Sequence, residues 1–545
     1  MNGCCGAGSA GWRRLCPRQG VCGVLLVVLI AAAALAFRLD RLELRPLHVD
    51  EAVQAVKAGE LYDSGHYIYN PFEFHGPSLY YLTLPVLRLS GARCFADAGE
   101  ATFRLVPVMF GAGLILLLLL LRRDLGLAAG LTSAALLAVS PAMVFFSRYY
   151  IQEMVLVFFA ALALGALWRF FRTSRKRWVV WLGLALGMMY ATKETSVIFA
   201  GVMAGAYGWL VLRRRAREGR ALWHVRREHA WLMLLAVAVA AVVAGLFYSS
   251  WLAHPRGPLD SLLAFGHYFD RSGGDGSAAL HQQPWYYYLQ LLAYTKNAPG
   301  PWWSEGLILA LAGVGFGSVL RGRLPAAINP ELAGFLAVYA LGMTLVFALI
   351  PYKTPWNLLG FLHGLILMAG IGASALFHRL PRCGARVMLA LLLVAGAGQL
   401  AAQAARAKGR FCADPRNPYV YAHSGPDVVR LARRISELAA LHADGAALPI
   451  HIISPDYWPL PYYLRKLQRV GYWTAMPPAP DAPLIVVSAA MQEQLEPLLR
   501  QRYHAEFYGL RPGVLLVLNV EQDLWQRYLL EKSAAQAPPK AAPTD

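Results

Sequence analysis

Long apolar runs alternate with short polar segments along most of this chain. A hydrocarbon core about 30 Å thick requires roughly 20 mostly apolar residues in a helix that crosses it. By this pattern we expect about eleven spans, at residues 21–37, 101–121, 127–146, 154–168, 179–192, 195–212, 230–252, 305–320, 333–350, 357–377 and 387–402. The predicted fold class is an all-α polytopic membrane bundle.

Two apolar segments are ambiguous by length alone. Residues 21–37 follow three arginines, as in a signal peptide, but no small-residue cleavage site precedes the polar stretch after Phe37. We therefore expect a retained first helix. Residues 77–89 are apolar but short, and a span there would move the downstream basic loops to the other side of the membrane. We expect this segment to lie along the outer interface or to dip into it.

Basic residues mark one side of the predicted bundle. With the N-terminus in the cytoplasm, the segments on that side are 1–20, 122–126, 169–178, 213–229, 321–332 and 378–386. They hold 22 Lys or Arg and 4 Asp or Glu, nearly all of the formal net charge of +19. Basic residues resist translocation, so this bias predicts a multi-pass protein of the inner (plasma) membrane. Short helix flanks are not the continuous basic stripe that nucleic-acid binding requires.

The pattern changes after the last apolar run, where charge rises. Strands are predicted at 450–454 and 484–488, with a hairpin-like pair at 506–509 and 514–520, and they alternate with helices at 426–442, 461–468, 489–501 and after 520. This alternation predicts a small C-terminal α/β domain over 418–532. An odd number of spans places it outside the cytoplasm. Residues 533–545, rich in Ala and Pro, are expected to be disordered.

The predicted organisation is a cytoplasmic segment 1–20, a transmembrane domain 21–402 and the C-terminal domain, with outer loops at 38–100 and 253–304. Composition agrees with a bilayer environment, because 57% of the residues are hydrophobic and 15% are charged, against about 25% charged in an average globular domain. Of the seven cysteines, Cys94 and Cys412 fall outside. One disulfide between them is compatible with the pattern, whereas a disulfide framework is not.

A pair of carboxylates, Asp50 and Glu51, begins an amphipathic helix in the first outer loop. Asp50 is suited to be an N-cap, and Glu51 a first-turn acid that the helix dipole favours. The alternative is that one of the two takes a proton from an acceptor hydroxyl as a general base. Both roles are compatible with the same position.

Four further polar motifs are predicted on the same side of the bundle. Three of them have a structural alternative: an aromatic interface belt for the segment around His75, a snorkelling side chain for Arg148, and paired charges for Lys193 and Glu194. The motifs are Tyr67 to Tyr81 with His75-Gly76-Pro77, Ser147-Arg148-Tyr149-Tyr150-Ile151-Gln152-Glu153, Ala191-Thr192-Lys193-Glu194-Thr195, and Pro351-Tyr352-Lys353-Thr354-Pro355-Trp356-Asn357. Arginine and lysine on this face are suited to contact phosphate.

Together these motifs resemble the GT-C membrane glycosyltransferases. The chain is similar to the dolichyl-phosphate-mannose protein mannosyltransferase-like and aminoarabinose-transferase-like families over roughly residues 20–400. The resemblance rests on Asp50-Glu51, His75-Gly76-Pro77 and the segment from Arg148 to Glu153. The residue sequences of these motifs look most like those of a prokaryotic subgroup labelled flippase activity-associated proteins. Two further motifs add to this resemblance, Gln283-Pro284-Trp285-Tyr286-Tyr287-Tyr288 and Tyr352 to Trp356. Many relatives carry a basic residue where His75 stands.

The resemblance implies a hexosyltransferase that moves a sugar from a polyprenyl-phosphate donor to an extracytoplasmic acceptor, with inversion. The acceptor is a protein, a lipid or a polysaccharide. The implied catalytic residues are Asp50 and Glu51; the donor-phosphate ligands are Arg148, Lys193 and Lys353; the substrate-binding residues are His75, Tyr149, Tyr150, Glu153 and Trp285. Some relatives use a divalent metal, to which Glu153 and His75 would contribute, but no His or Cys spacing demands one and no cofactor is firmly predicted.

Three questions stay open on the sequence. A non-catalytic accessory or flippase-associated subunit of a glycan assembly pathway is the alternative to an enzyme, whereas no internal repeat supports a secondary transporter. In the C-terminal domain, the aromatic motifs at 456–458, 461–463 and 471–473 suit stacking on sugar rings as well as core packing. The loop around His281 to Tyr288 is suited to cap the cavity or to form an interfacial helix.

Overall fold

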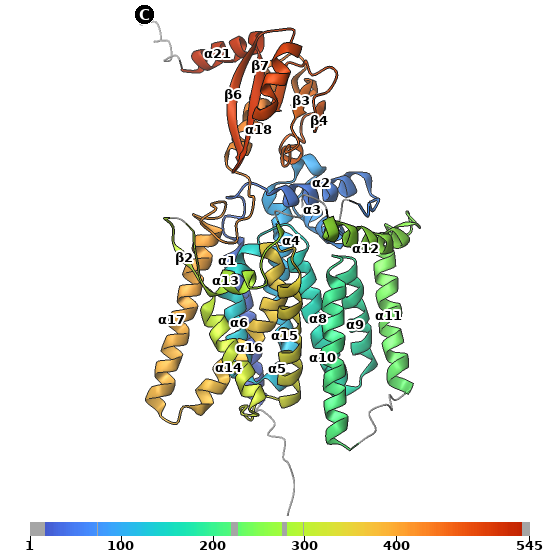
Figure 1. Cartoon of the computed structure of the whole chain (residues 1–545), viewed down its shortest axis with the longest axis vertical. Coiled ribbons are helices and arrows are strands. Elements are labelled where there is room, and N and C mark those ends of the chain that lie inside the picture. The colour runs from blue at the N-terminus through green and yellow to red at the C-terminus, as the bar shows by residue number, and fades with distance from the viewer. Residues whose placement is uncertain (1–16, 73–74, 220–226, 275–280, 298, 537–545) are drawn as a thin grey trace, which may run out of the picture.

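The computed structural model describes residues 17–72, 75–219, 227–274, 281–297 and 299–536. An α/β domain stands on one end of a helical bundle (Figure 1). The bundle helices are α1 (Pro17–Leu39), α4 (Glu100–Leu116), α5 (Arg122–Leu125), α6 (Leu127–Val139), α7 (Pro141–Phe146), α8 (Glu153–Thr173), α9 (Lys176–Tyr190), α10 (Ser196–Arg217), α11 (Arg227–Tyr248), α14 (Gly306–Leu320), α15 (Pro330–Leu349), α16 (Leu359–Arg379) and α17 (Cys383–Lys408). The predicted membrane-bundle fold class is confirmed.

Among the described residues, 8 helices are long and apolar enough to cross a membrane. They are α1, α4 with the short helix after it, α8, α10, α11, α15, α16 and α17. Helices α6 and α14 are apolar but shorter, and α9 has 15 residues. Each predicted span overlaps one of these helices, so the positions agree, while the total of eleven crossings stays a prediction.

The predicted span 127–146 is not one continuous helix, because the chain breaks into α6 and α7 at Ser140. Pro141 has no backbone N–H to continue α6, and the Ser140 hydroxyl accepts the Met143 N–H at 3.3 Å as an N-cap. The buried carboxylate of Glu305 accepts the Ser140 hydroxyl and the Ala142 N–H. A carboxylate at the first turn stabilises a helix N-terminus. Glu305, the residue before α14, therefore stabilises the N-terminus of α7.

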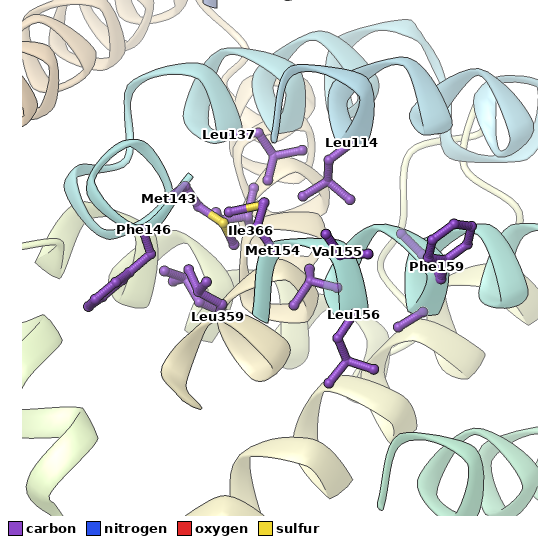
Figure 2. Packing of buried hydrophobic residues seen from close by; sticks show 14 of the residues in the cluster. Leu114, Leu137, Met143, Phe146, Met154, Val155, Leu156, Phe159, Leu359 and Ile366 are labelled. Carbon is purple, nitrogen blue, oxygen red and sulfur yellow. The ribbon is translucent and has the colours of Figure 1, made fainter. Parts of the chain in front are cut away.

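The bundle core joins helices that are distant in the sequence. Met143 of α7, Met154 of α8 and Ile366 of α16 belong to one buried cluster (Figure 2). Helices α14 and α16 approach closely because small residues face each other. A Cβ added at Gly372 would lie 1.9 Å from the carbonyl oxygen of Leu311, a distance that only glycine avoids.

Four shorter helices lie at the end of the bundle that carries the α/β domain (Figure 1): α2 (Val49–Ser64), α3 (Ser78–Leu89), α12 (Gly257–Gly274) and α13 (Tyr287–Ala293). Helix α3 packs on α2 above the bundle instead of crossing it, which agrees with the expected interfacial segment. Helix α12 was not predicted. It leaves Leu259 and Leu262 more than half exposed, at 56% and 62%, as in a helix that rests on a membrane surface.

The C-terminal domain is a five-stranded mixed sheet in the order β4-β3-β5-β7-β6. Its elements are α18 (Asp427–Leu441), β3 (Ile450–Ile453), α19 (Leu460–Tyr463), β4 (Val470–Trp473), β5 (Leu484–Ser488), α20 (Gln492–Leu495), β6 (Tyr503–Arg511), β7 (Val514–Glu521) and α21 (Gln522–Gln536). Strands β4, β3 and β5 are parallel, and β7 is antiparallel to β5 and β6. Leu484 and Val486 face the core with α18, whereas Ile485 and Val487 face the opposite side, the period-two pattern of a strand covered on both faces.

Several predicted boundaries in this domain are wrong. The aromatic motif 471–473, for which no strand was predicted, belongs to strand β4, because Val470 to Trp473 pair with β3. The predicted helix 461–468 shrinks to a single turn around α19, whereas the predicted helix 489–501 is a helical run over 489–498 in which α20 is flanked by two 3₁₀ turns. Helix α21 extends to Gln536 into the segment expected to be disordered, and the rest of that segment lies outside the described residues, as does most of 1–20.

Candidate active site at the outer end of the bundle

Helix α2 begins with a histidine cap that leaves one carboxylate open. His48 accepts the Asp50 backbone N–H through Nδ1 at 3.0 Å and is the N-cap of α2, so the predicted cap at Asp50 is wrong. The Asp50 side chain is 43% exposed and lies 3.8 Å from the His48 ring. Burial lowers the pKa of His48, so the ring is neutral near pH 7. Asp50 is therefore an accessible carboxylate fixed on a rigid helix.

Glu51 differs from Asp50, because its side chain is fully buried and both of its oxygens accept hydrogen bonds. Its oxygens accept from Arg104 at 2.9 and 3.0 Å and from Arg45 at 2.9 Å. The backbone N–H groups of His48 and Tyr150 add two hydrogen bonds, each of 3.0 Å. Burial alone would raise the Glu51 pKa, but the two guanidinium groups lower it to about 2. Glu51 is therefore an anion that joins α2, α4 and the turn after α7.

A wall of aromatic rings and histidines faces Asp50. Tyr149 is buried, stacks on His423 at 5.4 Å and 24°, and lies 5.8 Å from Trp356. Its hydroxyl has no hydrogen-bond partner among the described residues. Nearby, the Tyr421 hydroxyl and His281 Nδ1 are 2.7 Å apart. A buried tyrosine hydroxyl usually finds a partner, so this one is suited to meet a bound molecule.

Arg148 does not point at this wall. Its guanidinium donates to the carbonyl oxygens of Arg38, Asp40 and Arg41, which end helix α1. Burial and repulsion by Arg45 and other cations lower its pKa to about 10, at which it stays charged near pH 7. The structure thus gives Arg148 a capping contact instead of an open position beside Asp50. Tyr150 is also structural in its contacts, because its hydroxyl bonds Thr83 at 2.6 Å.

Two ion pairs form the side of the site between α3, α8 and the turn after α9. Lys193 donates to Glu153, and His75 contacts Glu194 at 2.8 Å. One oxygen of Glu153 and one of Glu194 have no hydrogen-bond partner among the described residues. Unsatisfied buried carboxylate oxygens are costly, so this side offers acceptors to polar groups of a bound molecule.

The His75-Gly76-Pro77 turn is held against the turn after α9 by a close backbone approach. A Cβ at Gly76 would lie 2.3 Å from the Ala191 carbonyl oxygen, and the Ser78 N–H donates to that oxygen at 2.9 Å. Glycine is needed here because no side chain fits. The motif therefore positions His75 next to Glu194.

The third cation, Lys353, lies on the segment before α16. It is 2% exposed, donates to the Ile350 carbonyl oxygen, and lies 6.0 Å from the Tyr288 ring. Burial lowers its pKa. Its backbone N–H pairs with the His281 carbonyl oxygen at 2.9 Å, so the loop from 281 closes over this segment, whereas Trp285 is 63% exposed.

Metal binding gains no support from the side chains in place. Within the described part of the chain, no group of three or more His, Cys, Asp or Glu could hold an ion. Glu153 is paired with Lys193 and His75 with Glu194, which does not make a shared coordination sphere. Cys94 and Cys412 are both free thiols, so the disulfide that the pattern allowed does not form.

The site includes five residues that the sequence analysis did not single out: Arg45, His48, Arg104, Tyr421 and His423. A usable signal existed for Arg104, because an arginine inside an apolar helix needs a partner. No local signal pointed to Tyr421 and His423, which lie on the connection to the C-terminal domain. That domain also contacts the first outer loop, since the Tyr463 hydroxyl accepts the Leu47 N–H at 2.8 Å.

These features define a polytopic membrane protein with a polar site at one end of its bundle. Solved structures share this architecture. ArnT from Cupriavidus metallidurans, bound to undecaprenyl phosphate, superposes with a TM-score of 0.62 at 17% identity over 91% of this chain and 98% of that one. The archaeal oligosaccharyltransferase AglB from Archaeoglobus fulgidus gives 0.54 at 14% identity over 94% and 77%. The fold is therefore that of the GT-C membrane glycosyltransferases.

Sequence comparisons agree with this class. Residues 86–248 match the family model of dolichyl-phosphate-mannose-protein mannosyltransferase. The undecaprenyl phosphate-α-4-amino-4-deoxy-L-arabinose arabinosyl transferase 1 of Pseudomonas fluorescens is 32% identical over 251 residues. This match spans 41% of the chain and 41% of that relative. The predicted resemblance to these families is confirmed, and the finer subgroup stays a prediction.

Proposed function

We propose that this protein is a membrane glycosyltransferase that moves a sugar from a polyprenyl-phosphate donor to an extracytoplasmic acceptor. The observation that carries the proposal is the different environment of two adjacent carboxylates. Asp50 is accessible beside an aromatic wall, whereas Glu51 is locked between Arg45 and Arg104. Only Asp50 can accept a proton from an incoming hydroxyl without breaking the fold.

In the proposed reaction, the acceptor oxygen attacks the anomeric carbon from the face opposite the phosphate. The new carbon–oxygen bond forms as the bond to the phosphate oxygen breaks, which inverts the configuration. Asp50 takes the hydroxyl proton as general base. Polyprenyl phosphate leaves with the bonding electron pair, and nearby cations stabilise its charge.

The leaving phosphate is best served by Lys353, whose ammonium donates to the Ile350 carbonyl oxygen and forms no ion pair within the described residues. Lys193 and His75 have a weaker claim, because each is already paired with a carboxylate, Glu153 and Glu194 respectively. Arg148 has a weaker claim, because three carbonyl oxygens of the α1 end already accept its hydrogen bonds.

Transfer by the purified protein tests the proposal. The protein in detergent is mixed with a synthetic polyprenyl-phosphate hexose and a panel of peptide, lipid and oligosaccharide acceptors, and released polyprenyl phosphate is measured. Release that depends on both the protein and an acceptor supports the transferase. No release with any donor and acceptor would favour the accessory or flippase-associated subunit instead.

Lys353→Met is expected to raise the donor KM about tenfold, since one charge-assisted contact to phosphate is lost. The fold should survive, because the lost hydrogen bond leaves only the Ile350 carbonyl without this donor. Donor titrations at fixed acceptor check this. Lys296→Met is the matched control, because Lys296 lies on the short strand β1 (Thr295–Lys296) at the same end of the bundle and is exposed. An unchanged donor KM in Lys353→Met would remove Lys353 from the phosphate site.

We also propose that the site end of the bundle faces away from the cytoplasm. The basic last turn of α10 and the basic loops after α14 and α16 lie at the end opposite the α/β domain (Figure 1), as expected for a cytoplasmic side. Glu60→Cys and Trp285→Cys should react with an impermeant thiol reagent in intact cells. Arg321→Cys should react only after permeabilisation. The reverse pattern would contradict this orientation.

A further inference from the structure

The proposed base and the proposed phosphate cation lie on distant parts of the chain, and one residue of the C-terminal connection contacts the supports of both. Asp50 is in the first turn of α2, and Lys353 is on the segment before α16. Tyr421 lies on the connection between α17 and the C-terminal domain. It contacts one histidine on each side, His48 and His281, which the proposed reaction does not use.

The first contact of Tyr421 fixes the start of α2. His48 Nδ1 accepts the Asp50 N–H at 3.0 Å, so the neutral ring carries its proton on Nε2. That Nε2 donates to the Tyr421 carbonyl oxygen at 3.0 Å. Because His48 is buried, loss of this acceptor would leave an unpaired N–H, which is costly. The turn that carries Asp50 is therefore tied to the connection through both nitrogens of one ring.

The second contact of Tyr421 reaches the segment that carries Lys353. The Tyr421 hydroxyl and His281 Nδ1 form a hydrogen bond of 2.7 Å. The His281 carbonyl oxygen accepts the Lys353 N–H at 2.9 Å, and a second backbone hydrogen bond of 3.1 Å joins the same two segments. We call these two paired segments, 281–283 and 351–353, the outer ladder. The side chain of Tyr421 thus supports the ladder, while its carbonyl oxygen supports α2.

The backbone at Tyr421 is held in one conformation. The Tyr421 N–H donates to His423 Nδ1 at 3.0 Å, and His423 stacks on Tyr149. Between them, Ala422 has a φ of 49°, in the left-handed region that a residue with a Cβ rarely adopts. Such a conformation persists only where the surrounding contacts fix it, and it is most common at functional sites. Tyr421 is therefore a rigid link between α2 and the outer ladder.

We propose that Tyr421 is a positioning residue that fixes the base Asp50 and the cation Lys353 relative to each other. The inference rests on the proposed transferase function. In that reaction the proton acceptor and the phosphate cation act on opposite faces of one carbon atom, so their separation must be held for both to act at once. Tyr421 acts through His48 on one side and through His281 on the other.

Two variants that each cut one side of the link separate binding from turnover. Tyr421→Phe removes only the hydroxyl, so the ladder loosens; the donor KM should rise about fivefold with kcat unchanged at saturating donor. His48→Asn keeps an N-cap for α2, but the shorter side chain does not reach the Tyr421 carbonyl oxygen. It should lower kcat by up to about 10²-fold with the donor KM unchanged. Parallel changes of KM and kcat in both variants would indicate a merely structural role and contradict the proposal.

A double-mutant cycle tests whether Tyr421 acts through Lys353. Tyr421→Phe combined with Lys353→Met should raise the donor KM about tenfold, as Lys353→Met does alone, because both changes affect the same cation. Tyr421→Phe combined with Lys296→Met should give the about fivefold rise of Tyr421→Phe. A rise of about fiftyfold in the first double variant would mean that the two residues act independently, which would overturn the link.

Hydrogen–deuterium exchange of the full-length protein in detergent tests the link without turnover. Tyr421→Phe should speed exchange several-fold in peptides that cover the outer ladder. Tyr463→Phe is the matched control, because its hydroxyl contacts Leu47 and Glu100; it should leave exchange in the ladder unchanged. Faster exchange in Tyr421→Phe, with no sugar transfer by the wild type, would retain the link and overturn the transferase. Unchanged exchange in Tyr421→Phe, in a wild type that transfers sugar, would overturn the positioning role alone.

Discussion

Asp50→Asn is expected to lower sugar transfer by about 10²–10⁴-fold, the range for loss of a general base. The amide has nearly the same size and shape as the carboxylate, but it cannot take a proton at neutral pH. Because the Asp50 side chain is 43% exposed and is not part of the buried ion-pair network, the folded protein should persist. Initial rates of polyprenyl phosphate release, at saturating donor, measure the effect on turnover.

Glu60→Gln is the matched control for this variant. Glu60 is on the same helix, is 54% exposed, and forms a surface ion pair with Lys57. Its rate should equal that of the wild type. If Asp50→Asn transfers sugar at the control rate, another group takes the proton and the carboxylate assignment fails.

Glu51→Gln is expected to destabilise the protein by about 3–5 kcal/mol, the usual cost of removing one partner from a buried ion pair. Arg45 and Arg104 would lose their common carboxylate inside the protein. Thermal unfolding in detergent and the yield of monodisperse protein measure the effect. Asp50→Asn should leave both unchanged, so the two adjacent variants separate stability from catalysis. A stable but inactive Glu51→Gln would instead give Glu51 a direct catalytic part.

The pKa of Glu51 fixes the sign of this contribution with pH. A carboxylate whose pKa is lowered to about 2 in the folded state stabilises that state above its unfolded pKa of about 4.3. This stabilisation is lost as pH falls from about 4.3 toward 2. At neutral pH Glu51 is therefore a permanent anion, and an inflection of the rate above pH 5 cannot be its titration.

The sequence predicted the bundle well because a lipid-spanning helix is a local property. An apolar run such as 101–121 needs no partner to be recognised, and α4 with the turn after it covers almost the same residues. The break at Ser140 escaped because apolar residues continue on both sides of Pro141. Strand β4 escaped because a four-residue strand with three glycine or aromatic positions resembles a surface motif.

The candidate site was only partly predictable for the same reason. Sidedness follows from charge in the loops, so Asp50, Lys193 and Lys353 were correctly placed at one end of the bundle. Ion-pair partners are set by long-range packing, and Glu51 meets Arg104 across 53 positions of sequence. The contact of Tyr149 with His423 depends on how the C-terminal connection folds back, which no periodicity encodes.

That connection has a practical consequence for protein engineering. Tyr419, Tyr421 and His423 occupy the wall of the site, where they meet Glu305, His281 and Tyr149. A fragment cut after the last apolar helix would leave a water-filled gap at this place. Chimeras that exchange the C-terminal domain between related chains therefore need their crossover after residue 424. Each bundle then keeps its own Tyr419, Tyr421 and His423.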